Sequence, residues 1–142
     1  MWLIVSIGVI LSLFFFDKQR LFASNILGFA IFFSAIFYWL YIFISAWQVH
    51  HQAIRNTAEI DKIISIGIYG RVRHPMYSGD IVLAWGFFLA FPYLSVLIGV
   101  LWLTAVLLFW ASLEEKAMTK KFGEEYTKYQ SRTPMLVPRW KK

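Results

Sequence analysis

The chain has 142 residues, of which 59% are hydrophobic and only 15% are charged. The charged residues fall in clusters between long uncharged stretches, a pattern typical of an integral membrane protein and not of a soluble domain. Because there is no cysteine, disulfides, thiolate zinc sites and a cysteine nucleophile are excluded. The net charge of +6 does not indicate nucleic-acid binding, because the basic residues flank apolar runs, where they commonly face anionic lipid headgroups.

Two uncharged runs at the start of the chain are each predicted to cross a membrane as a helix. They are Met1 to Phe16 and Leu21 to Val49, and the charged cluster Asp17 to Arg20 separates them. A hydrocarbon core of about 30 Å needs about 20 helical residues, so the first span is short and the second is long enough to tilt. A cleaved signal peptide is the alternative for the first run, but a basic segment at its start is missing.

The third apolar run, Ile81 to Leu113, is too long to be one straight helix across a membrane. At 1.5 Å per residue it would reach about 50 Å. Phe91-Pro92-Tyr93 lies near its middle, and proline both lacks a backbone donor and disfavours helix in the residue before it. We therefore expect a hairpin of two antiparallel helices that is broken near Pro92.

The distribution of basic residues favours four spans. With a hairpin, 12 of the 14 lysines and arginines lie on one side of the membrane, and only Lys18 and Arg20 lie on the other. The positive-inside rule then places both termini and the polar loop in the cytoplasm. The expected fold is all-α, a single multi-pass membrane domain over residues 1–142. Its predicted parts are two N-terminal spans (1–49), a polar loop (50–80), the helical hairpin (81–113) and a cytoplasmic amphipathic helix with a tail (114–142).

A polar segment, Arg73 to Gly79, lies between two apolar runs and is the strongest candidate for a ligand site. An ionisable group close to hydrocarbon costs about 2.5 to 3.5 kcal/mol on insertion scales, so it usually has a function there. His74 and Tyr77 provide donors and ring faces suited to a polar ligand above an apolar floor. Glu114 is expected to turn toward this loop and meet Arg73, His74 or a bound cation.

Several neighbouring residues have plainer interpretations. We expect Glu115 to be solvated, and an ordinary interfacial pairing of the two glutamates with nearby lysines remains an alternative. Arg71 is expected to face lipid phosphates. His50 and His51 are expected to anchor the second span at the interface, because adjacent histidines on a helix point about 100° apart and do not readily share one ion. A position close to the substrate for one of them remains an alternative. Three aromatic residues at helical spacing suggest an amphipathic helix that lies on the membrane or roofs the site: Phe122, Tyr126 and Tyr129.

Four motifs together resemble a known family. They occur in order along roughly residues 60–138: Gly67-Ile68-Tyr69, then Val72 to Gly79 (Val-Arg-His-Pro-Met-Tyr-Ser-Gly), then Glu114-Glu115, then Phe122 to Tyr126 followed by Tyr129. This pattern is similar to that of the membrane methyltransferases that include isoprenylcysteine carboxyl methyltransferase and the phospholipid methyltransferases. The first two spans match that family only as generic membrane helices.

The resemblance implies a helical S-adenosylmethionine site on the cytosolic side, unrelated to the soluble Rossmann methyltransferases. By position, Glu114 would contact the amino acid or sulfonium end of the cofactor, and Ile63 and Ile64 would flank the adenine. Two positions depart from the family pattern. Trp110 stands where a substrate-binding arginine is expected, and Asp61 replaces a histidine. The remaining residues that would line the cofactor are Tyr69, Arg73, His74, Pro75, Met76 and Tyr77.

The leading hypothesis is a methyltransferase that uses S-adenosylmethionine to methylate a lipidic or small apolar acceptor from the bilayer. No metal is expected, and the sequence assigns no catalytic residue. Isoprenylated cysteine, a phospholipid amine and a small thiol all remain possible acceptors. If the acceptor must lose a proton, Glu114, Arg73 or water could take it. The alternatives are a nicotinamide-dependent membrane reductase of the sterol reductase type and a non-enzymatic lipid-binding protein.

Overall fold

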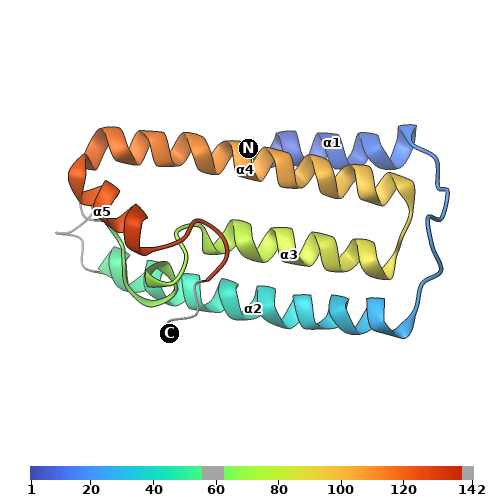
Figure 1. The fold of residues 1–142 in the computed structure, drawn as a ribbon, viewed down its shortest axis with the longest axis horizontal. Coiled ribbons are helices and arrows are strands. Elements are labelled where there is room, and N and C mark those ends of the chain that lie inside the picture. The colour runs from blue at the N-terminus through green and yellow to red at the C-terminus, as the bar shows by residue number, and fades with distance from the viewer. Residues whose placement is uncertain (56–62, 139–142) are drawn as a thin grey trace.

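The computed structural model describes residues 1–55 and 63–138, and within these ranges the named elements are all helices, joined by short non-helical segments. Four helices run side by side in alternating directions, with a small helical cap at one end (Figure 1). The prediction of an all-α fold is therefore confirmed. The elements are α1 (Trp2–Phe15), α2 (Ile26–Arg55), the 3-10 helix η2 (Gly67–Gly70), α3 (Pro75–Ala90), α4 (Leu94–Phe122) and α5 (Glu124–Arg132).

The bundle is built mainly from two helix pairs, α2 with α3 and α1 with α4. Small residues allow the backbones in each pair to approach closely, as is common between membrane helices. A Cβ added at Gly86 of α3 would lie 2.8 Å from the Cβ of Ala35 in α2. One added at Gly99 of α4 would lie 2.8 Å from the hydroxyl of Ser12 in α1. The glycines therefore set how near the paired helices come.

The predicted break at Pro92 is confirmed, since α3 ends at Ala90 and α4 begins at Leu94. The turn is held by the linker between α1 and α2. The backbone N–H of Leu21 donates to the Pro92 carbonyl at 2.8 Å, and the N–H of Leu94 donates to the Gln19 carbonyl at 2.9 Å. These bonds satisfy backbone groups that the interrupted helices cannot pair themselves.

Three helix boundaries differ from the expectation. Helix α2 begins at Ile26 instead of Leu21 and continues to Arg55 instead of stopping at Val49, and α3 begins at Pro75 instead of Ile81. The start of α3 has a clear cause, because proline has a helical φ and no N–H to satisfy, which suits the first position of a helix. The predicted polar loop is thus shorter than residues 50–80. Its last part, residues 75–80, is the first turn and a half of α3.

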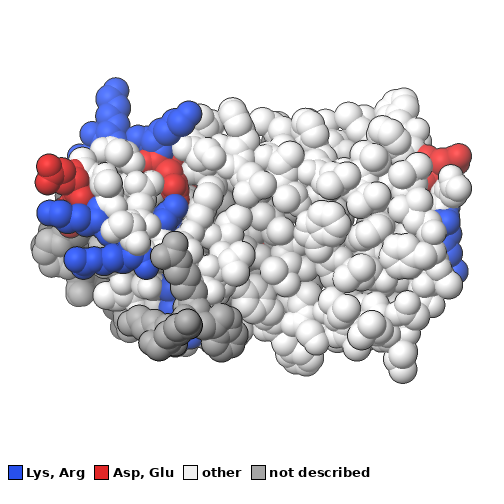
Figure 2. All heavy atoms as spheres, in the orientation of Figure 1, with Lys and Arg blue, Asp and Glu red and all other residues white. Residues whose placement is uncertain are grey.

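Among the residues that the structure describes, two helices are long and apolar enough to cross a membrane, namely the Ile26–Val49 part of α2 and all of α4. Helix α1 has 14 residues and α3 has 16, which is shorter than a full crossing requires. Charged side chains gather at the two ends of the molecule and leave an uncharged belt between them on the visible face (Figure 2). Four crossings with cytoplasmic termini remain a prediction.

Helix α4 extends past its apolar part, as expected, and ends at Phe122. Gly123 follows with φ 55° and ψ −127°, a backbone conformation that residues other than glycine rarely adopt. The chain reverses there and α5 folds back toward the start of α3 (Figure 1). Residues from η2, α3, α4 and α5 therefore meet at one end of the bundle.

Candidate functional site

A cavity of about 540 Å³ lies where these four elements meet. All nine residues that the sequence proposed for cofactor binding line it. Six further residues complete the wall, and most of the lining is apolar or aromatic. The full set is Ile63, Ile64, Tyr69, Arg73, His74, Pro75, Met76, Tyr77, Glu114, Ala117, Met118, Lys121, Phe122, Tyr126 and Tyr129.

Helix α4 contributes one continuous face to the cavity. Glu114, Ala117, Met118 and Lys121 recur at intervals of three and four residues, which is the spacing of one helix face. The sequence analysis singled out only Glu114 among these four. The helical spacing that starts at Glu114 was a signal that would have found the other three.

Helix α5 forms the roof of the cavity. Tyr126 is buried, and both Tyr126 and Tyr129 line the cavity together with Phe122 at the end of α4. The hydroxyl of Tyr129 donates to the backbone carbonyl of Tyr69 at 2.6 Å. Burial, with the neighbouring Tyr126, raises the pKa of Tyr129 to about 12. This lining agrees with one of the two predicted placements for these aromatic residues, a roof over the site, and a position on the membrane surface stays a prediction.

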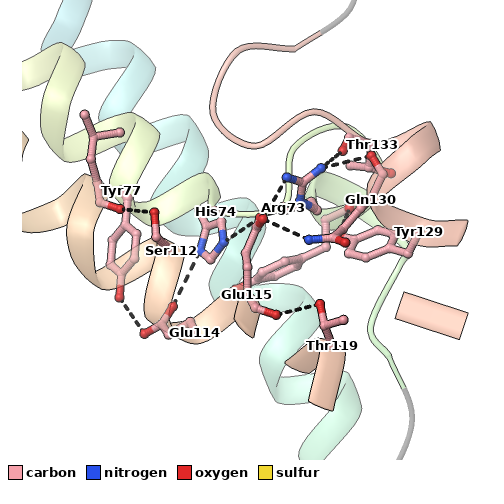
Figure 3. A network of polar contacts seen from close by, with 12 residues as sticks. Arg73, His74, Tyr77, Ser112, Glu114, Glu115, Thr119, Tyr129, Gln130 and Thr133 are labelled. Carbon is pink, nitrogen blue, oxygen red and sulfur yellow. Dashed lines mark hydrogen bonds and ion pairs between the residues drawn. The ribbon is translucent and has the colours of Figure 1, made fainter. Parts of the chain in front are cut away.

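Glu114 turns toward the start of α3, as predicted. The hydroxyl of Tyr77 donates to its Oε1 at 2.8 Å, and Nδ1 of His74 lies 3.5 Å from its Oε2 (Figure 3). Its side chain keeps 43% of its exposure. Glu114 thus presents a partly exposed carboxylate, oriented by two neighbours, at the wall of the cavity.

The expectation that Glu115 is solvated is wrong. Its side chain is only 15% exposed and accepts hydrogen bonds from Nε of Arg73 at 2.6 Å and from Nη2 at 3.0 Å. Nε2 of Gln130 donates to the same carboxylate at 3.0 Å. Consecutive residues point about 100° apart on a helix, so Glu114 faces the cavity while Glu115 faces the loop arginine and α5 (Figure 3).

Arg73 joins the loop to the segment that follows α5. Its Nη1 donates to the carbonyl of Gln130 at 3.0 Å and also to the carbonyl of Thr133. The backbone N–H groups of Arg73 and His74 donate to the carbonyls of Pro134 at 2.9 Å and Met135 at 3.0 Å. The guanidinium lines the cavity, but its donors are used to hold the cavity wall together.

His74 lies between the two glutamates, with its Nε2 3.2 Å from Oε1 of Glu115. Its ring stacks on that of Tyr77 at a centroid distance of 5.5 Å and an interplanar angle of 5°. Burial lowers the pKa of His74 below its usual value and outweighs the opposing effect of the two carboxylates. An ionised carboxylate only accepts hydrogen bonds, so each ring nitrogen of His74 bonds to its glutamate only where that nitrogen has a proton.

Some residues considered from the sequence lie outside the site. Arg71 is exposed, does not line the cavity, and donates to the hydroxyl of Tyr41 at 3.4 Å. Trp110 is partly buried on α4 and is likewise absent from the lining. Asp61 and the side chains of His50 and His51 fall outside the described residues. In the part of the chain that the structure describes, no group of three or more metal-ligating side chains occurs.

Comparison with known proteins agrees with this architecture. The sequence profile described as phospholipid methyltransferase matches residues 23–125, which cover the second helix, the cavity loop, the hairpin and the start of α5. The chain belongs to the phospholipid methyltransferase family. This confirms the resemblance that the four motifs suggested.

Similar proteins carry two kinds of name. A methanethiol S-methyltransferase of Pseudomonas deceptionensis is 40% identical over 73 residues, or 50% of this chain and 26% of that protein. A methanethiol S-methyltransferase of Bradyrhizobium diazoefficiens is 28% identical over 104 residues, or 67% of this chain and 32% of the relative. A Delta(14)-sterol reductase of Mus musculus is 32% identical over 83 residues, or 57% of this chain and 20% of the reductase. The matches thus span about a third or less of these relatives, and no solved structure matches the chain.

Proposed function

We propose that this chain is an S-adenosylmethionine-dependent methyltransferase that methylates a small apolar acceptor at the cytosolic side of a membrane. The observation that carries the proposal is the cavity itself. It combines an oriented carboxylate, Glu114, with apolar and aromatic walls in a protein of the phospholipid methyltransferase family. Such a combination suits a ligand that has a positive charge and large apolar parts.

The lining fits the cofactor in chemistry and in size. Cavities of about 300 to 1,000 Å³ hold ligands of cofactor size, and this one measures about 540 Å³. Ile63, Ile64 and Tyr69 provide apolar and aromatic surface for a purine ring. Glu114 provides a negative charge for a sulfonium or ammonium group. S-adenosylmethionine supplies the activated methyl group when it is bound.

The chain's own residues contribute by binding, orienting and excluding water. Methyl transfer from a sulfonium is an in-line displacement in which positive charge disperses, so alignment of donor and acceptor in a dry site supplies much of the acceleration. The aromatic roof of Tyr126 and Tyr129 covers the cavity, and Tyr77 and His74 hold Glu114 in place. No covalent intermediate with the protein is needed.

A small acceptor is favoured by the packing beside the cavity. Tyr77 of α3 packs against the fully buried Leu107 and Ala111 of α4, and Leu103 and Ile81 fill the space around them. In the part of the molecule that is described, side chains therefore occupy the region between α3 and α4 where a long lipid chain would have to lie. The name methanethiol S-methyltransferase, carried by two of the relatives reported above, points toward a small thiol.

The proposed orientation has four crossings, with the cavity in the cytoplasm. The end of the bundle that contains the cavity also has most of the basic residues, and the opposite end has Lys18 and Arg20. This asymmetry is what the positive-inside rule expects of a cytoplasmic end. The polar cofactor would enter from the water phase, and an apolar acceptor would enter from the membrane.

Calorimetry on the purified protein in detergent tests the cofactor. Binding of S-adenosylmethionine without binding of NADPH is the expected result. The reverse would support a reductase, an alternative that we retain because a sterol reductase is among the relatives. Binding of neither would contradict both enzymatic proposals and leave a lipid-binding protein.

A second experiment identifies the acceptor. Methanethiol and, separately, a total phospholipid extract are incubated with the protein and isotopically labelled S-adenosylmethionine. We expect labelled dimethyl sulfide in the headspace and no methylated lipid in the mass spectrum. Label that appears only in phospholipid would show that the acceptor is a lipid and that the packed region between α3 and α4 opens in the membrane.

A further inference from the structure

We propose that a hollow on the surface of α4 binds the phosphate headgroup of an anionic phospholipid, whose acyl chains lie along the exposed apolar face of the same helix. The hollow measures about 560 Å³ and is formed by α4, α5 and the segment after α5. It shares no lining residue with the cofactor cavity, so this site is independent of the methyl transfer proposed above.

Two lysines give the hollow its positive charge. Lys116 and Lys120 line it, lie four residues apart on α4 and are both exposed. The alternative that they pair with the two adjacent glutamates is not observed. Among the residues that the structure describes, neither lysine side chain forms a hydrogen bond or an ion pair. Both positive charges are therefore free to meet an anion.

The other polar groups in the wall are already engaged. Glu115 also lines the hollow, but its carboxylate accepts hydrogen bonds from Arg73 and from Nε2 of Gln130. The hydroxyls of Ser112 and Thr119 donate to carbonyls one turn earlier in α4. The two ammonium groups are therefore the donors that this wall offers to a phosphate.

The position of the lysines along α4 matches the headgroup layer of a bilayer. The uncharged part of the helix, residues 94–113, has the length of about 20 residues that a hydrocarbon core of about 30 Å requires. Lys116 and Lys120 follow about 4.5 Å and 10.5 Å beyond Leu113 along the helix axis. The headgroup layer is about 5 to 7 Å thick, and a lysine can extend its ammonium to that level. With α4 across the bilayer, lipid phosphates lie within reach of both ammonium groups.

An exposed apolar stripe on α4 leads into the hollow. Leu101, Ala105 and Leu108 precede Ser112 at steps of three or four residues, so they lie on one face of the helix. All three are exposed, with 47% of Leu101 and 40% of Leu108 accessible. A phospholipid has the same order of a charged head followed by apolar chains. The stripe and the hollow together therefore fit a lipid, whereas a free phosphate would use the hollow alone.

The charges of the hollow favour an anionic headgroup over a zwitterionic one. Phosphatidylglycerol has a net negative charge, which basic residues near a membrane surface attract. Phosphatidylcholine has a cationic group beside its phosphate. The wall offers that cation no unpaired carboxylate, because Glu115 is paired with Arg73.

Lys128 and Arg132 of α5 provide a matched control. They are also basic, exposed and four residues apart, but they do not line the hollow. One double variant combines Lys116→Gln with Lys120→Gln, and the other combines Lys128→Gln with Arg132→Gln. Each removes two positive charges. A general effect of net charge would therefore appear in both, whereas a direct contact would appear only in the first.

Native mass spectrometry of the full chain, released from detergent micelles, measures the affinity of individual bound lipids. The probes are phosphatidylglycerol and phosphatidylcholine with the same acyl chains, and glycerol 3-phosphate, which has the phosphate without the chains. We expect the wild type to bind phosphatidylglycerol about tenfold more tightly than either other probe, or better. The variant of Lys116 and Lys120 should lose about 10- to 30-fold in affinity for phosphatidylglycerol, the change expected for two surface lysines. The control variant should stay within about twofold of the wild type.

Three results would overturn the lipid site. Equal affinities of the wild type for the two lipids would show that the headgroup charge is not recognised. Equal binding of glycerol 3-phosphate would show that the apolar stripe takes no part, and an equal loss in both double variants would show an effect of net charge alone. A thermal unfolding midpoint within the wild-type range shows that each variant is folded.

Discussion

Arg73 and Glu115 are 42 residues apart and form an ion pair with two hydrogen bonds, from Nε at 2.6 Å and from Nη2 at 3.0 Å. Their side chains are 10% and 15% exposed. This geometry matches the planar fork of a guanidinium to the two oxygens of a carboxylate, which is the strongest form of such a pair. It ties the loop before α3 to the C-terminal part of α4.

Arg73→Gln is expected to destabilise the protein by about 2 to 4 kcal/mol, because it leaves Glu115 partly buried without its charge partner and frees two carbonyls. Chemical denaturation in detergent, or the thermal midpoint, measures the effect. Arg71→Gln is the control. Arg71 is exposed and its bond to Tyr41 is long, so the loss there should stay below about 0.5 kcal/mol. Equal effects of the two substitutions would contradict the role assigned to Arg73.

The two adjacent glutamates are expected to separate binding from stability. Glu114→Gln should weaken S-adenosylmethionine binding by about 1 to 2 kcal/mol or more, the scale of a lost hydrogen bond to a charged group, with little change in the unfolding midpoint. Glu115→Gln should lower the midpoint, because it breaks the pair with Arg73. Calorimetry and thermal unfolding on both variants measure the two quantities. A Glu114→Gln protein with unchanged affinity would argue strongly against the cofactor assignment.

The stability of the folded protein is expected to fall at high pH because of Tyr129, which lies in the roof of the cavity. Its pKa is about 12 in the folded protein and about 10 in an unfolded chain, so the folded state keeps the proton over that interval. The resulting stabilisation is complete below pH 10 and is lost as the pH rises toward 12. The tyrosinate absorbance of the wild type minus that of Tyr129→Phe isolates this group. A difference that titrates at the ordinary tyrosine value would show that the hydroxyl is solvated.

Tyr129→Phe has a separate effect at neutral pH. It removes the bond to the Tyr69 carbonyl, which should cost about 0.5 to 1.5 kcal/mol. The thermal midpoint at pH 7 measures this loss independently of the titration.

Close packing of α2 on α3 is expected to make the protein much less tolerant of an alanine at Gly28 than of one at Gly79. A Cβ at Gly28 would collide with the backbone carbonyl of Leu89, which cannot move without shifting α3. Gly28→Ala should therefore destabilise by about 1 to 3 kcal/mol, as overpacking does. Gly79→Ala is the matched change, because the nearest atoms to its added Cβ belong to side chains and not to backbone, the closest being 3.3 Å away in Trp39. Thermal unfolding midpoints compare the two variants. A larger loss of stability in Gly79→Ala than in Gly28→Ala would contradict the close packing of α2 on α3 at Gly28.

The absence of cysteine makes the chain suitable for accessibility mapping. Lys18→Cys and Lys128→Cys each introduce a single thiol, the first in the linker between α1 and α2 and the second in α5, and these two segments lie at opposite ends of the molecule (Figure 1). In sealed cells or vesicles, a membrane-impermeant maleimide is expected to label Lys18→Cys from the outside and Lys128→Cys only after permeabilisation. Labelling of both from one side would contradict the three crossings, by α2, α3 and α4, that are predicted between the two positions.

The main features of the fold follow from local physics and were predictable from the sequence. The break at Pro92, the end of α4 beyond its apolar part and the helix after Gly123 each depend on properties of neighbouring residues. The early start of α3 at Pro75 was missed because a proline after a polar segment suits both a turn and the first position of a helix. Local pattern does not distinguish the two.

The residues that line the cavity were predictable where they lie close together in the sequence or recur at helical spacing. Features of the site that depend on tertiary contacts were not predictable. The lining by His74, Met76 and Tyr77 follows from one short segment. Which of two adjacent glutamates is buried depends on the position of Arg73, and the partners of Arg73 include backbone carbonyls after α5. A carbonyl is present in every residue, so no sequence signal marks it as an acceptor.

The pairing of residues 73 and 74 with residues 134 and 135 has a consequence for biosynthesis. The loop and helices that line the cavity emerge from the ribosome first. Residues 134 and 135, which hold the segment after α5 against the loop, emerge some sixty residues after residues 73 and 74, with which they pair. A nascent chain halted after Phe122 would carry the motif residues in an open groove. The order of translation therefore keeps the pocket from closing until both helices of the hairpin have been synthesised.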